Sequence, residues 1–410
     1  MKTRQFWYPL PERLIAQHPA ERRGTERMMV LHRDTGMLEH RHIADIVEYI
    51  GPNDLLVVND TKVFPARLVG TWTDTPGAVE VLLVSPAAAA GRRPPAASPV
   101  WNCMLGSGRR CREGQVAVFG PKGELHARLQ KPLVGIGMWQ VEFLCSRPLM
   151  DLLDEFGRTP VPPYVKREGT REEEMEDRER YQTIYAREVG SVAAPTAGLH
   201  FTPEIFAALD AKGVKRAAVT LHVGPGTFRP VKAENIEDHQ MDFEAFTVPP
   251  ETADAVNACK ARGGRVFCVG STTVRTLETV AAAVEQDRVE LGSSRVDAGS
   301  NRVDVGSNRV ELVSNDIGGS TLIDAKSTLT DSISPHKVVV PGSGASDIFI
   351  YPPYRFRVCD CMLTNFHLPQ STLLMMISAL AGRERVLCSY AMAVQQNYMF
   401  FSYGDCMLIV

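Results

Sequence analysis

The sequence predicts a multi-domain α/β protein, and three observations lead to this prediction. The chain has 410 residues, which is enough for two hydrophobic cores. Its hydrophobic content of 44% and charged content of 23% are ordinary for a globular protein. Residues 66–160 show short strand patterns separated by Gly and Pro turns, whereas the chain after Tyr181 alternates between helix and strand patterns.

The first part of the chain leads into a strand-rich region. Residues 1–65 contain a leading segment, a helix near Ala44–Tyr49 and a strand at Leu55–Val58. The regular spacing of the next strands favours a small barrel or sandwich. These strands are expected at 78–84, 101–105, 115–119, 124–129 and 138–143. The Pro- and Ala-rich stretch Ser85–Pro99 is interpreted as a loop.

The second part of the chain predicts a layered sheet. Segment 165–182 is densely charged and is typical of a solvated helix or linker. After it, helix and strand patterns alternate, as in a sheet covered by helices. Helices are expected at 203–212, 251–262 and 273–285, and strands at 214–223, 265–269 and 354–358.

An internal repeat interrupts this alternation. Four seven-residue units follow one another over Arg288–Asn315. A coiled coil needs apolar residues three and four apart, but here they lie two apart, and Gly, Ser and Asn fill other positions. We therefore interpret residues from about 286 to 345 as a low-complexity surface insertion without a catalytic role.

Several protein classes are excluded by composition and motifs. The net charge of -3 gives no overall basic field for nucleic acid. Nine cysteines without CxxC spacing fit a reducing cytoplasm; we expect Cys359 and Cys361 to be core thiols and expect no metal site. The sequence shows no secretory signal and no apolar run of membrane-spanning length. It also contains no dinucleotide-binding glycine motif and no P-loop. We therefore expect a cytoplasmic protein without membrane association.

The run Ser191–Glu204 is the most informative polar segment. Thr202 can cap a helix, Pro203 suits its first position, and Glu204 suits its positive end. Thr196 and His200 therefore lie in a loop that leads into a helix N-terminus, a common place for an anion or polar ligand.

Further polar loops follow other predicted strands. Asp60 ends a strand, so its carboxylate can face a cleft at the sheet edge. His200, His222 and His367 each have apolar neighbours; one such histidine is usually structural, but three in Gly-, Thr- and Pro-containing loops favour a functional role for at least one. The turn Gly270–Thr273 can hold an anion or simply cap the next helix, and its residues favour neither. The loops are 59–61, 196–200, 222–229, 271–275, 364–367 and 403–405.

Ten motifs in a fixed order carry a family resemblance. They are Leu10–Gln17, Val58–Arg67, Gly157–Arg167, Tyr181–Tyr185, Ser191–Glu204, Thr220–Pro230, Val269–Glu278, Phe349–Phe356, Leu363–Gly382 and Phe400–Ile409. With them the chain resembles the S-adenosylmethionine:tRNA ribosyltransferase-isomerases, the QueA family of queuosine biosynthesis. Only 85–99 and about 286–345 fall outside the resemblance.

The resemblance implies a fold and a reaction. The expected fold is an α/β catalytic domain, residues 1–65 and 160–410, interrupted by an inserted six-stranded β-barrel, residues 66–159. The expected reaction moves the ribosyl group of S-adenosylmethionine to 7-aminomethyl-7-deazaguanine at the wobble position of tRNA. Isomerisation then gives epoxyqueuosine, with release of adenine and methionine. A monomer that uses no metal is expected.

The reaction suggests roles for the polar loops. A general base must remove a proton from the carbon next to the sulfonium, and Asp60 or His200 is the candidate. His222 or His367 would assist the departure of adenine, and Asn365 would orient the ribose. The methionine carboxylate would bind Arg275 or the turn Ser271–Thr273. The other expected substrate contacts are Asn59, Thr61, Arg67, Thr196, Thr227, Arg229, Thr272, Tyr403 and Asp405.

The RNA needs cations and a stacking partner. Lys166, Arg167 and Arg229 are expected on tRNA phosphates, and Phe228, Phe366 or Tyr403 against the splayed base. Two rival functions are an RNA methyltransferase that also uses S-adenosylmethionine and a non-catalytic protein whose barrel binds RNA. The missing glycine-rich cofactor loop disfavours the first, and the polar loops outside the strand-rich region disfavour the second.

Overall fold

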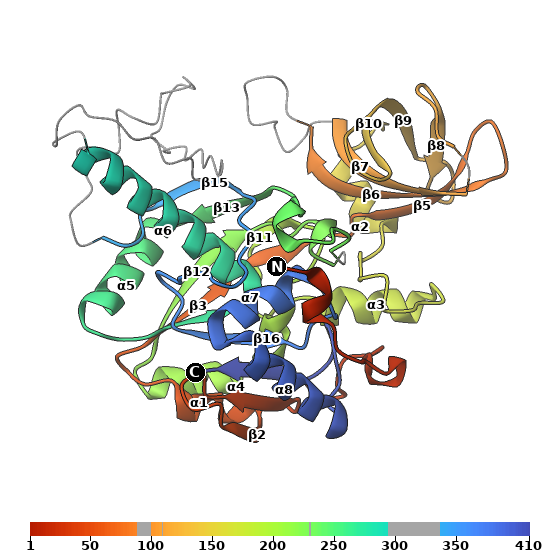
Figure 1. The fold of residues 1–410 in the computed structure, drawn as a ribbon. Helices are drawn as coiled ribbons and strands as arrows, with labels where there is room; N and C mark the ends of the chain where they lie inside the picture. The colour runs from red at the N-terminus through yellow and green to blue at the C-terminus, as the bar shows by residue number, and fades with distance from the viewer. Residues whose placement is uncertain (88–99, 109, 229–230, 294–336) are drawn as a thin grey trace. The chain divides into compact units, whose positions relative to one another are not determined.

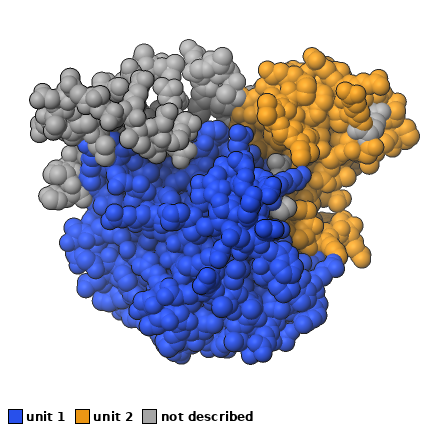
Figure 2. Space-filling view, in the orientation of Figure 1, with its two compact units in different colours: residues 1–61, 183–186, 195–410 blue, residues 62–182, 187–194 orange. Residues whose placement is uncertain are grey.

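A computed structural model describes residues 1–87, 100–108, 110–228, 231–293 and 337–410 of the chain. It contains two compact units, coloured separately in Figure 2. The first unit comprises residues 1–61, 183–186 and 195–410, and the second comprises residues 62–182 and 187–194. A large mixed sheet with helices forms the first and a closed barrel the second, so the predicted fold class is confirmed. Sequence analysis placed the division at 66 and 159 instead.

The first unit is built on a nine-stranded sheet (Figure 1). The strand order is β15-β13-β12-β3-β14-β16-β17-β1-β2. Strands β12, β3, β14 and β16 run parallel to one another, whereas β13, β15, β17 and β2 each pair antiparallel with a neighbour. The bounds are β1 Arg27–Leu31, β2 Leu38–His42, β3 Leu55–Asn59, β12 Lys215–Leu221, β13 Glu244–Val248, β14 Val266–Val269, β15 Gly342–Ser346, β16 Cys361–Asn365 and β17 Cys406–Ile409.

Apolar side chains cover both faces of the central strands, so these strands are almost continuously hydrophobic. Every residue of β3, β14, β16 and β17 is buried. On one face Leu56 and Val58 pack with α1 (Ile46–Tyr49), the 3-10 helix η4 (Thr196–His200) and α4 (Pro203–Ala211). Side chains alternate along a strand, so Leu55 and Val57 point to the other face, where α5 (Pro250–Ala261) and α6 (Gly270–Ser293) also contact β3. Helices α7 (Thr372–Ala381) and α8 (Arg383–Gln395) contact each other.

The predicted start of α4 is confirmed in atomic detail. The hydroxyl of Thr202 accepts a hydrogen bond from the backbone N–H of Ile205 at 3.4 Å, and Pro203 occupies the first turn. Shorter 3-10 helices are η1 Thr3–Phe6, η2 Glu12–Leu14, η3 Ile43–Asp45, η5 Pro225–Phe228 and η6 Ile236–Asp238.

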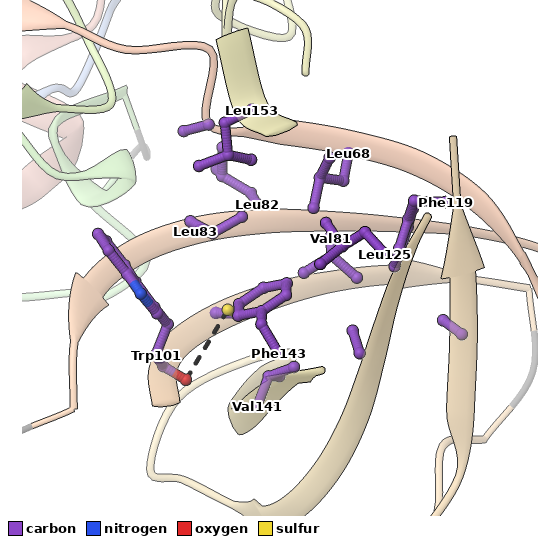
Figure 3. Close-up of a cluster of buried hydrophobic side chains, with 14 of the residues drawn as sticks. Leu68, Val81, Leu82, Leu83, Trp101, Phe119, Leu125, Val141, Phe143 and Leu153 are labelled. Carbon is purple, nitrogen blue, oxygen red and sulfur yellow. Dashed lines mark hydrogen bonds between the residues drawn. The ribbon is translucent and has the colours of Figure 1, made fainter. Parts of the chain in front are cut away.

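The second unit contains a closed antiparallel barrel with the order β10-β7-β6-β5-β8-β9. Its strands are β5 Arg67–Trp72, β6 Ala78–Pro86, β7 Val100–Ser107, β8 Val116–Phe119, β9 Leu125–Pro132 and β10 Met138–Leu144. Figure 3 shows the side chains that fill it, among them Leu68, Val81, Phe119 and Phe143. Each such buried side chain contributes about 1.5–3 kcal/mol relative to exposure. Leu153 of α2 (Leu149–Phe156) joins this core.

The rest of the second unit is a charged helix and a short ribbon. Helix α3 (Arg171–Arg180) lies in the segment predicted as a solvated helix or linker, and Thr170 caps it by accepting from Glu173 N at 3.2 Å. Strand β11 (Glu188–Ser191) pairs with β4 (Thr61–Val63).

Three element predictions differ from the structure. Helix α6 continues to Ser293, where the insertion was expected from about residue 286, and residues 342–346 form strand β15. The expected strand at 354–358 is not formed. The loop at 85–99 and the repeat fall largely on residues 88–99 and 294–336, which lie outside the described part of the chain.

Candidate active site at the strand ends

Six strands bring polar residues to one edge of the sheet. The parallel strands β12, β3, β14 and β16 end at this edge, and His222, Asp60, Ser271 and Asn365 lie at or just beyond their ends. Strand β17 runs the opposite way and β1 runs parallel to β17, so both begin at this edge. The chain leaves β3 for β12 on one side and later returns to β14 on the other, a switch point where α/β sheets commonly bind ligands.

The ends of β3 and β12 are joined by side chains. Oδ1 of Asp60 accepts a hydrogen bond from the Thr220 hydroxyl at 2.6 Å. The Thr61 hydroxyl and Nδ1 of His222 are 2.8 Å apart. Both amide atoms of Asn59 are used by the backbone, since Nδ2 donates to Leu221 O and Oδ1 accepts from Leu221 N, each at 3.0 Å. Asn59 therefore fixes the two strand ends, and the Asp60 carboxylate and the His222 imidazole are the two side chains of this cluster that could exchange a proton.

A second cluster surrounds His200, which is 1% exposed. Nδ2 of Asn365 lies 3.1 Å from Nε2 of His200 and donates to Phe401 O at 3.0 Å. On the other side of the ring, Nδ1 lies 3.8 Å from Oε1 of Glu26. Burial alone would raise the pKa of Glu26, but the nearby His200 and the N–H of Gly24 outweigh it, so the pKa is lowered. This arrangement favours the tautomer with a proton on Nδ1 facing the carboxylate.

Tyr185 is a half-buried residue beside the loop that holds His200, and its hydroxyl is buried. Its hydroxyl lies against η4, because a Cβ added to Gly198 would come within 2.0 Å of it. Burial raises the pKa of Tyr185, and the negative charge of Asp60 raises it further, whereas Arg23 opposes the shift. The phenol is therefore uncharged near neutral pH, and its hydroxyl has no hydrogen-bond partner among the described residues.

The turn after β14 adds a helix N-terminus. Helix α6 begins at Gly270 immediately after β14 ends at Val269. Thr273 donates to Val269 O at 2.8 Å, whereas Ser271 is half-buried. The first N–H groups of a helix have no partner within the helix, so this turn can receive a carboxylate.

Arg275 has a partner inside the protein. Its guanidinium donates to the carboxylate of Glu244 and to Ser346 O at 3.2 Å, and the side chains of Arg275 and Glu244 are each 3% exposed. Separating a buried ion pair is costly. Of the two predicted partners for the methionine carboxylate, the turn at Ser271 is therefore better placed than Arg275.

His367 and Phe366 lie in the core. Thr364 Oγ1 is 2.7 Å from Nε2 of His367, and burial lowers the pKa of His367 to about 3. The imidazole is uncharged near neutral pH and cannot act as an imidazolium acid. Phe366 is fully buried and packs on Tyr390 and other rings, which leaves no face for an RNA base, contrary to the stacking role considered above.

The C-terminal loop is held by Asp405. One carboxylate oxygen accepts from Arg27 N at 2.8 Å and the other from Met399 N at 2.7 Å. Burial raises the pKa of Asp405, although these hydrogen bonds oppose the rise. Tyr403 is 6% exposed. Asp405 thus holds the start of β1 and the loop at Met399 together.

The remaining predicted residues belong elsewhere. Arg67 is in the second unit, where Nε lies 3.3 Å from Glu80 and Nη2 donates to Val161 O at 3.1 Å. Arg167 makes two hydrogen bonds to Asp177, at 2.9 and 2.8 Å, so its charge is compensated, whereas Lys166 is exposed. Thr196 is the half-buried first residue of η4. The Thr227 side chain and Arg229 lie outside the described part of the structure, as does the side chain of Phe228.

Glu26, Tyr185 and Thr220 lie at the candidate site but were not predicted from the sequence as site residues. Glu26 directly precedes β1, which begins at this edge because it pairs in parallel with β17, and β17 is antiparallel to β16. No local sequence pattern reveals this pairing. Tyr185 lies in a motif quoted for the family resemblance, and that motif could have directed attention to it.

The described residues offer neither a metal-binding cluster nor a membrane-spanning helix. They contain no group of three or more His, Cys, Asp or Glu side chains placed to hold a metal ion. Among them there is also no helix long and apolar enough to cross a membrane.

The fold and the site together define a class: an α/β enzyme with its polar site at a sheet switch point and a β-barrel inserted after the central strand. Residues 3–409 match the family described as Queuosine biosynthesis protein, and the chain belongs to that family. The resemblance stated from the sequence is thereby confirmed.

Named relatives agree with this assignment. A protein of Moorella thermoacetica is 43% identical over 411 residues and one of Acetivibrio thermocellus 41% over 409, with 100% of each chain covered; both are called S-adenosylmethionine:tRNA ribosyltransferase-isomerase. The crystal structure of a Thermotoga maritima S-adenosylmethionine tRNA ribosyltransferase is 30% identical, with 99% and 100% coverage and a TM-score of 0.47.

Proposed function

We propose that the protein is an S-adenosylmethionine:tRNA ribosyltransferase-isomerase. It transfers the ribosyl group of S-adenosylmethionine to 7-aminomethyl-7-deazaguanine at the tRNA wobble position and isomerises it, giving epoxyqueuosine, adenine and methionine. Membership of the queuosine biosynthesis family and full-length relatives of this name support the reaction. We further propose that the enzyme acts in the cytoplasm as a monomer and needs no metal.

One structural observation supports placing the active site at the strand ends. Four buried polar atoms around the strand ends have no hydrogen-bond partner among the described residues. They are Tyr185 OH, Nδ1 of His200, Thr272 Oγ1 and Oδ1 of Asn365. A buried polar atom without a partner costs about 1–3 kcal/mol, so a group of them at one sheet edge is what a polar ligand such as S-adenosylmethionine would satisfy.

The geometry favours Asp60 over His200 as the general base. Nε2 of His200 already lies 3.1 Å from Nδ2 of Asn365, which also donates to Phe401 O, whereas Nδ1 lies 3.8 Å from a carboxylate oxygen of Glu26. The Asp60 carboxylate is buried and accepts at Oδ1 from Thr220. We propose that Asp60 removes the proton next to the sulfonium, that Asn365 orients the ribose, and that His222 assists the departure of adenine.

The assignment of Asp60 is tested by single-turnover release of adenine. We expect Asp60→Asn to slow this step by about 10²–10⁴-fold, because the amide keeps the shape of the carboxylate but cannot take a proton. Thr220→Val, which removes only the hydrogen bond to Oδ1, should have a smaller effect. A near-wild-type rate for Asp60→Asn with S-adenosylmethionine bound would exclude Asp60 as the base.

We propose that Lys166 contacts a tRNA phosphate and that Arg167 positions the Lys166 segment through Asp177.

The reaction itself is tested by mass spectrometry with S-adenosylmethionine and an anticodon stem-loop carrying 7-aminomethyl-7-deazaguanine. Adenine, methionine and epoxyqueuosine are the expected products. S-adenosylhomocysteine with methylated RNA would instead establish a methyltransferase, and bound but unchanged RNA a non-catalytic binding protein.

A further inference from the structure

An open depression at one end of the barrel has no role in the site described above. Its volume is about 730 Å³, and its lining includes Arg110, Arg112, Leu105, Pro132 and Trp139. Strands β7 and β9 end here, at Ser107 and Pro132, and β10 begins here at Met138. The chain enters the barrel at Arg67 and leaves it at Leu144, at the opposite end of the strands.

The barrel is basic although the chain is not. Residues 66–144 contain nine Lys or Arg but only five Asp or Glu, while the whole chain has a net charge of -3. Two ion pairs, Glu80 with Arg67 at 3.3 Å and Glu142 with Arg128 at 3.4 Å, each take one charge of each sign and leave the excess of cations unchanged. A polyanion is the partner that such a charge imbalance favours.

Part of this positive charge is at the depression. Arg110 and Arg112 are exposed, and neither side chain forms an ion pair or hydrogen bond with the described residues. Glu113 is the one acid in the lining, so the lining keeps a net positive charge. Exposed guanidinium groups beside a concave surface are typical contacts for phosphate oxygens.

The depression also offers apolar surface for bases. The Trp139 ring is half-buried in its wall and packs against the edge of the barrel core. Beside it, the turn between β9 and β10 exposes Val134 (103%) and Ile136 (74%) to solvent. Positively charged side chains next to an aromatic side chain are typical of sites for unpaired nucleotides. Every base has a face that can stack on the ring, and every phosphate carries a negative charge.

We propose that this end of the barrel binds unpaired nucleotides of the tRNA substrate, with Arg110 and Arg112 on phosphates and Trp139 against a base. The identity of the RNA rests on the proposed function. The residues belong to the second unit, whereas the candidate active site belongs to the first. None of the residues that line the depression is assigned to ribosyl transfer, so we expect this RNA contact to increase affinity and leave the chemical step unchanged.

Binding of full-length tRNA to Arg110→Ala/Arg112→Ala tests the phosphate contacts. We expect Kd and KM for tRNA to rise roughly tenfold, kcat to stay unchanged, and the slope of log K against log salt to fall by about 1.4 for two contacts. The matched control is Lys122→Ala/Arg147→Ala, which removes two positive charges from the barrel's opposite end and should bind as wild type.

Trp139 gives an independent readout. Tryptophan fluorescence should be quenched on tRNA binding, and Trp139→Phe should abolish this quenching while Kd changes by less than about threefold. Trp139→Ala should weaken binding roughly tenfold, as loss of a stacking partner does. Because Trp139→Ala also removes packing, the conservative Phe variant and the two surface arginine changes keep the test valid if the Ala variant unfolds.

The outcomes separate this inference from the proposed function. If Arg110→Ala/Arg112→Ala keeps the wild-type Kd and salt slope, the depression is not an RNA site, even when the wild-type enzyme makes epoxyqueuosine. The same holds if the variant only changes self-association in sedimentation. If the wild type makes no epoxyqueuosine but its tRNA affinity depends on these arginines, the proposed function fails and the RNA site stands.

Discussion

The polar residues at the strand ends fall into two kinds. Some have every polar atom used by the protein itself: the amide of Asn59 holds the end of β12, and the carboxylate of Asp405 holds the backbone N–H groups of Arg27 in β1 and of Met399 in a loop. Others, such as Thr272 and Asn365, keep a buried atom without a partner among the described residues. Residues of the first kind order the edge, and residues of the second kind are those with capacity left for a ligand.

Sequence reasoning finds residues of both kinds but cannot separate them. Asp60 was predicted because it ends a strand, and His222 and Asn365 because they lie in polar loops of the family's motifs. The structure places all three at or just beyond the ends of strands that share one edge. The partners of Arg275 and Arg167 were not predictable. Glu244 lies 31 residues from Arg275 on another strand, and only the folded chain brings the two charges together.

His367 makes the stability of the protein depend on pH. Its pKa is about 3 in the folded protein, because burial disfavours the charged ring, and about 6.5 in an unfolded chain. Below pH 6.5 the unfolded state binds the extra proton, so stability is full above this pH and falls as the pH drops toward 3. From pH 7 to pH 5 this group should cost about 2 kcal/mol of unfolding free energy.

Urea denaturation of wild type and His367→Gln at pH 7 and pH 5 checks this value. The variant is expected to be less stable at pH 7, since it disturbs the hydrogen bond with Thr364, but to lose about 2 kcal/mol less than wild type between the two pH values. Equal losses in both proteins would show that the ring is protonated in the folded state.

At the scale of elements, local patterns predicted those that follow their own propensity. Five barrel strands and helices α4 and α5 are within a few residues of the predicted bounds. Strand β15 was missed because Gly342–Ser346 has no strand propensity and is extended only through pairing with β13. Residues 354–358 have strand-like composition, but the N–H groups of Arg357 and Val358 donate to the buried Glu278 and not to a neighbouring strand.

Strand β5 contains a glycine that the barrel requires. A Cβ added to Gly70 would lie 2.2 Å from Val118 O and 2.5 Å from the Phe119 ring, both on the paired strand β8. We expect Gly70→Ala to destabilise the barrel by about 1–3 kcal/mol, because backbone must shift. At Gly106 in β7 the added Cβ would meet only Glu80 Cβ, at 3.4 Å, so Gly106→Ala should be nearly neutral.

Thermal unfolding of the two alanine variants beside wild type measures this difference. If the Tm falls for Gly70→Ala but not for Gly106→Ala, the clash expected between an added Cβ at Gly70 and strand β8 is confirmed. Equal Tm values for all three proteins would mean that β5 and β8 separate at Gly70 at no cost.

At the scale of the whole molecule, the repeat and helix α6 overlap. The first repeat begins at Arg288, inside α6, and Arg288 donates to Lys337 O across the segment between them. The boundary of the insertion was not predictable, because the first repeat continues the helix without a break in pattern.

Two deletions distinguish the helix from the repeats. Deleting residues 295–315 should leave kcat and unfolding free energy unchanged. Deleting 288–315 should lower stability, since it removes the last turns of α6 and the hydrogen bond to Lys337. Turnover with tRNA and urea midpoints of both proteins are the measurements, and a large loss of turnover from the shorter deletion would show that the repeats take part in the reaction.

The sheet topology also sets an order of assembly during synthesis. Strand β3 pairs with β12, whose first residue Lys215 is opposite Leu55. A ribosome adding about 5–20 residues per second leaves β3 without this neighbour for roughly 8–30 s. In the barrel every strand pairs only with other barrel strands, so all of its strands are present once Leu144 has been synthesised. The central strand of the catalytic sheet is thus made early and completed late, and a chaperone would meet it as an uncovered apolar segment.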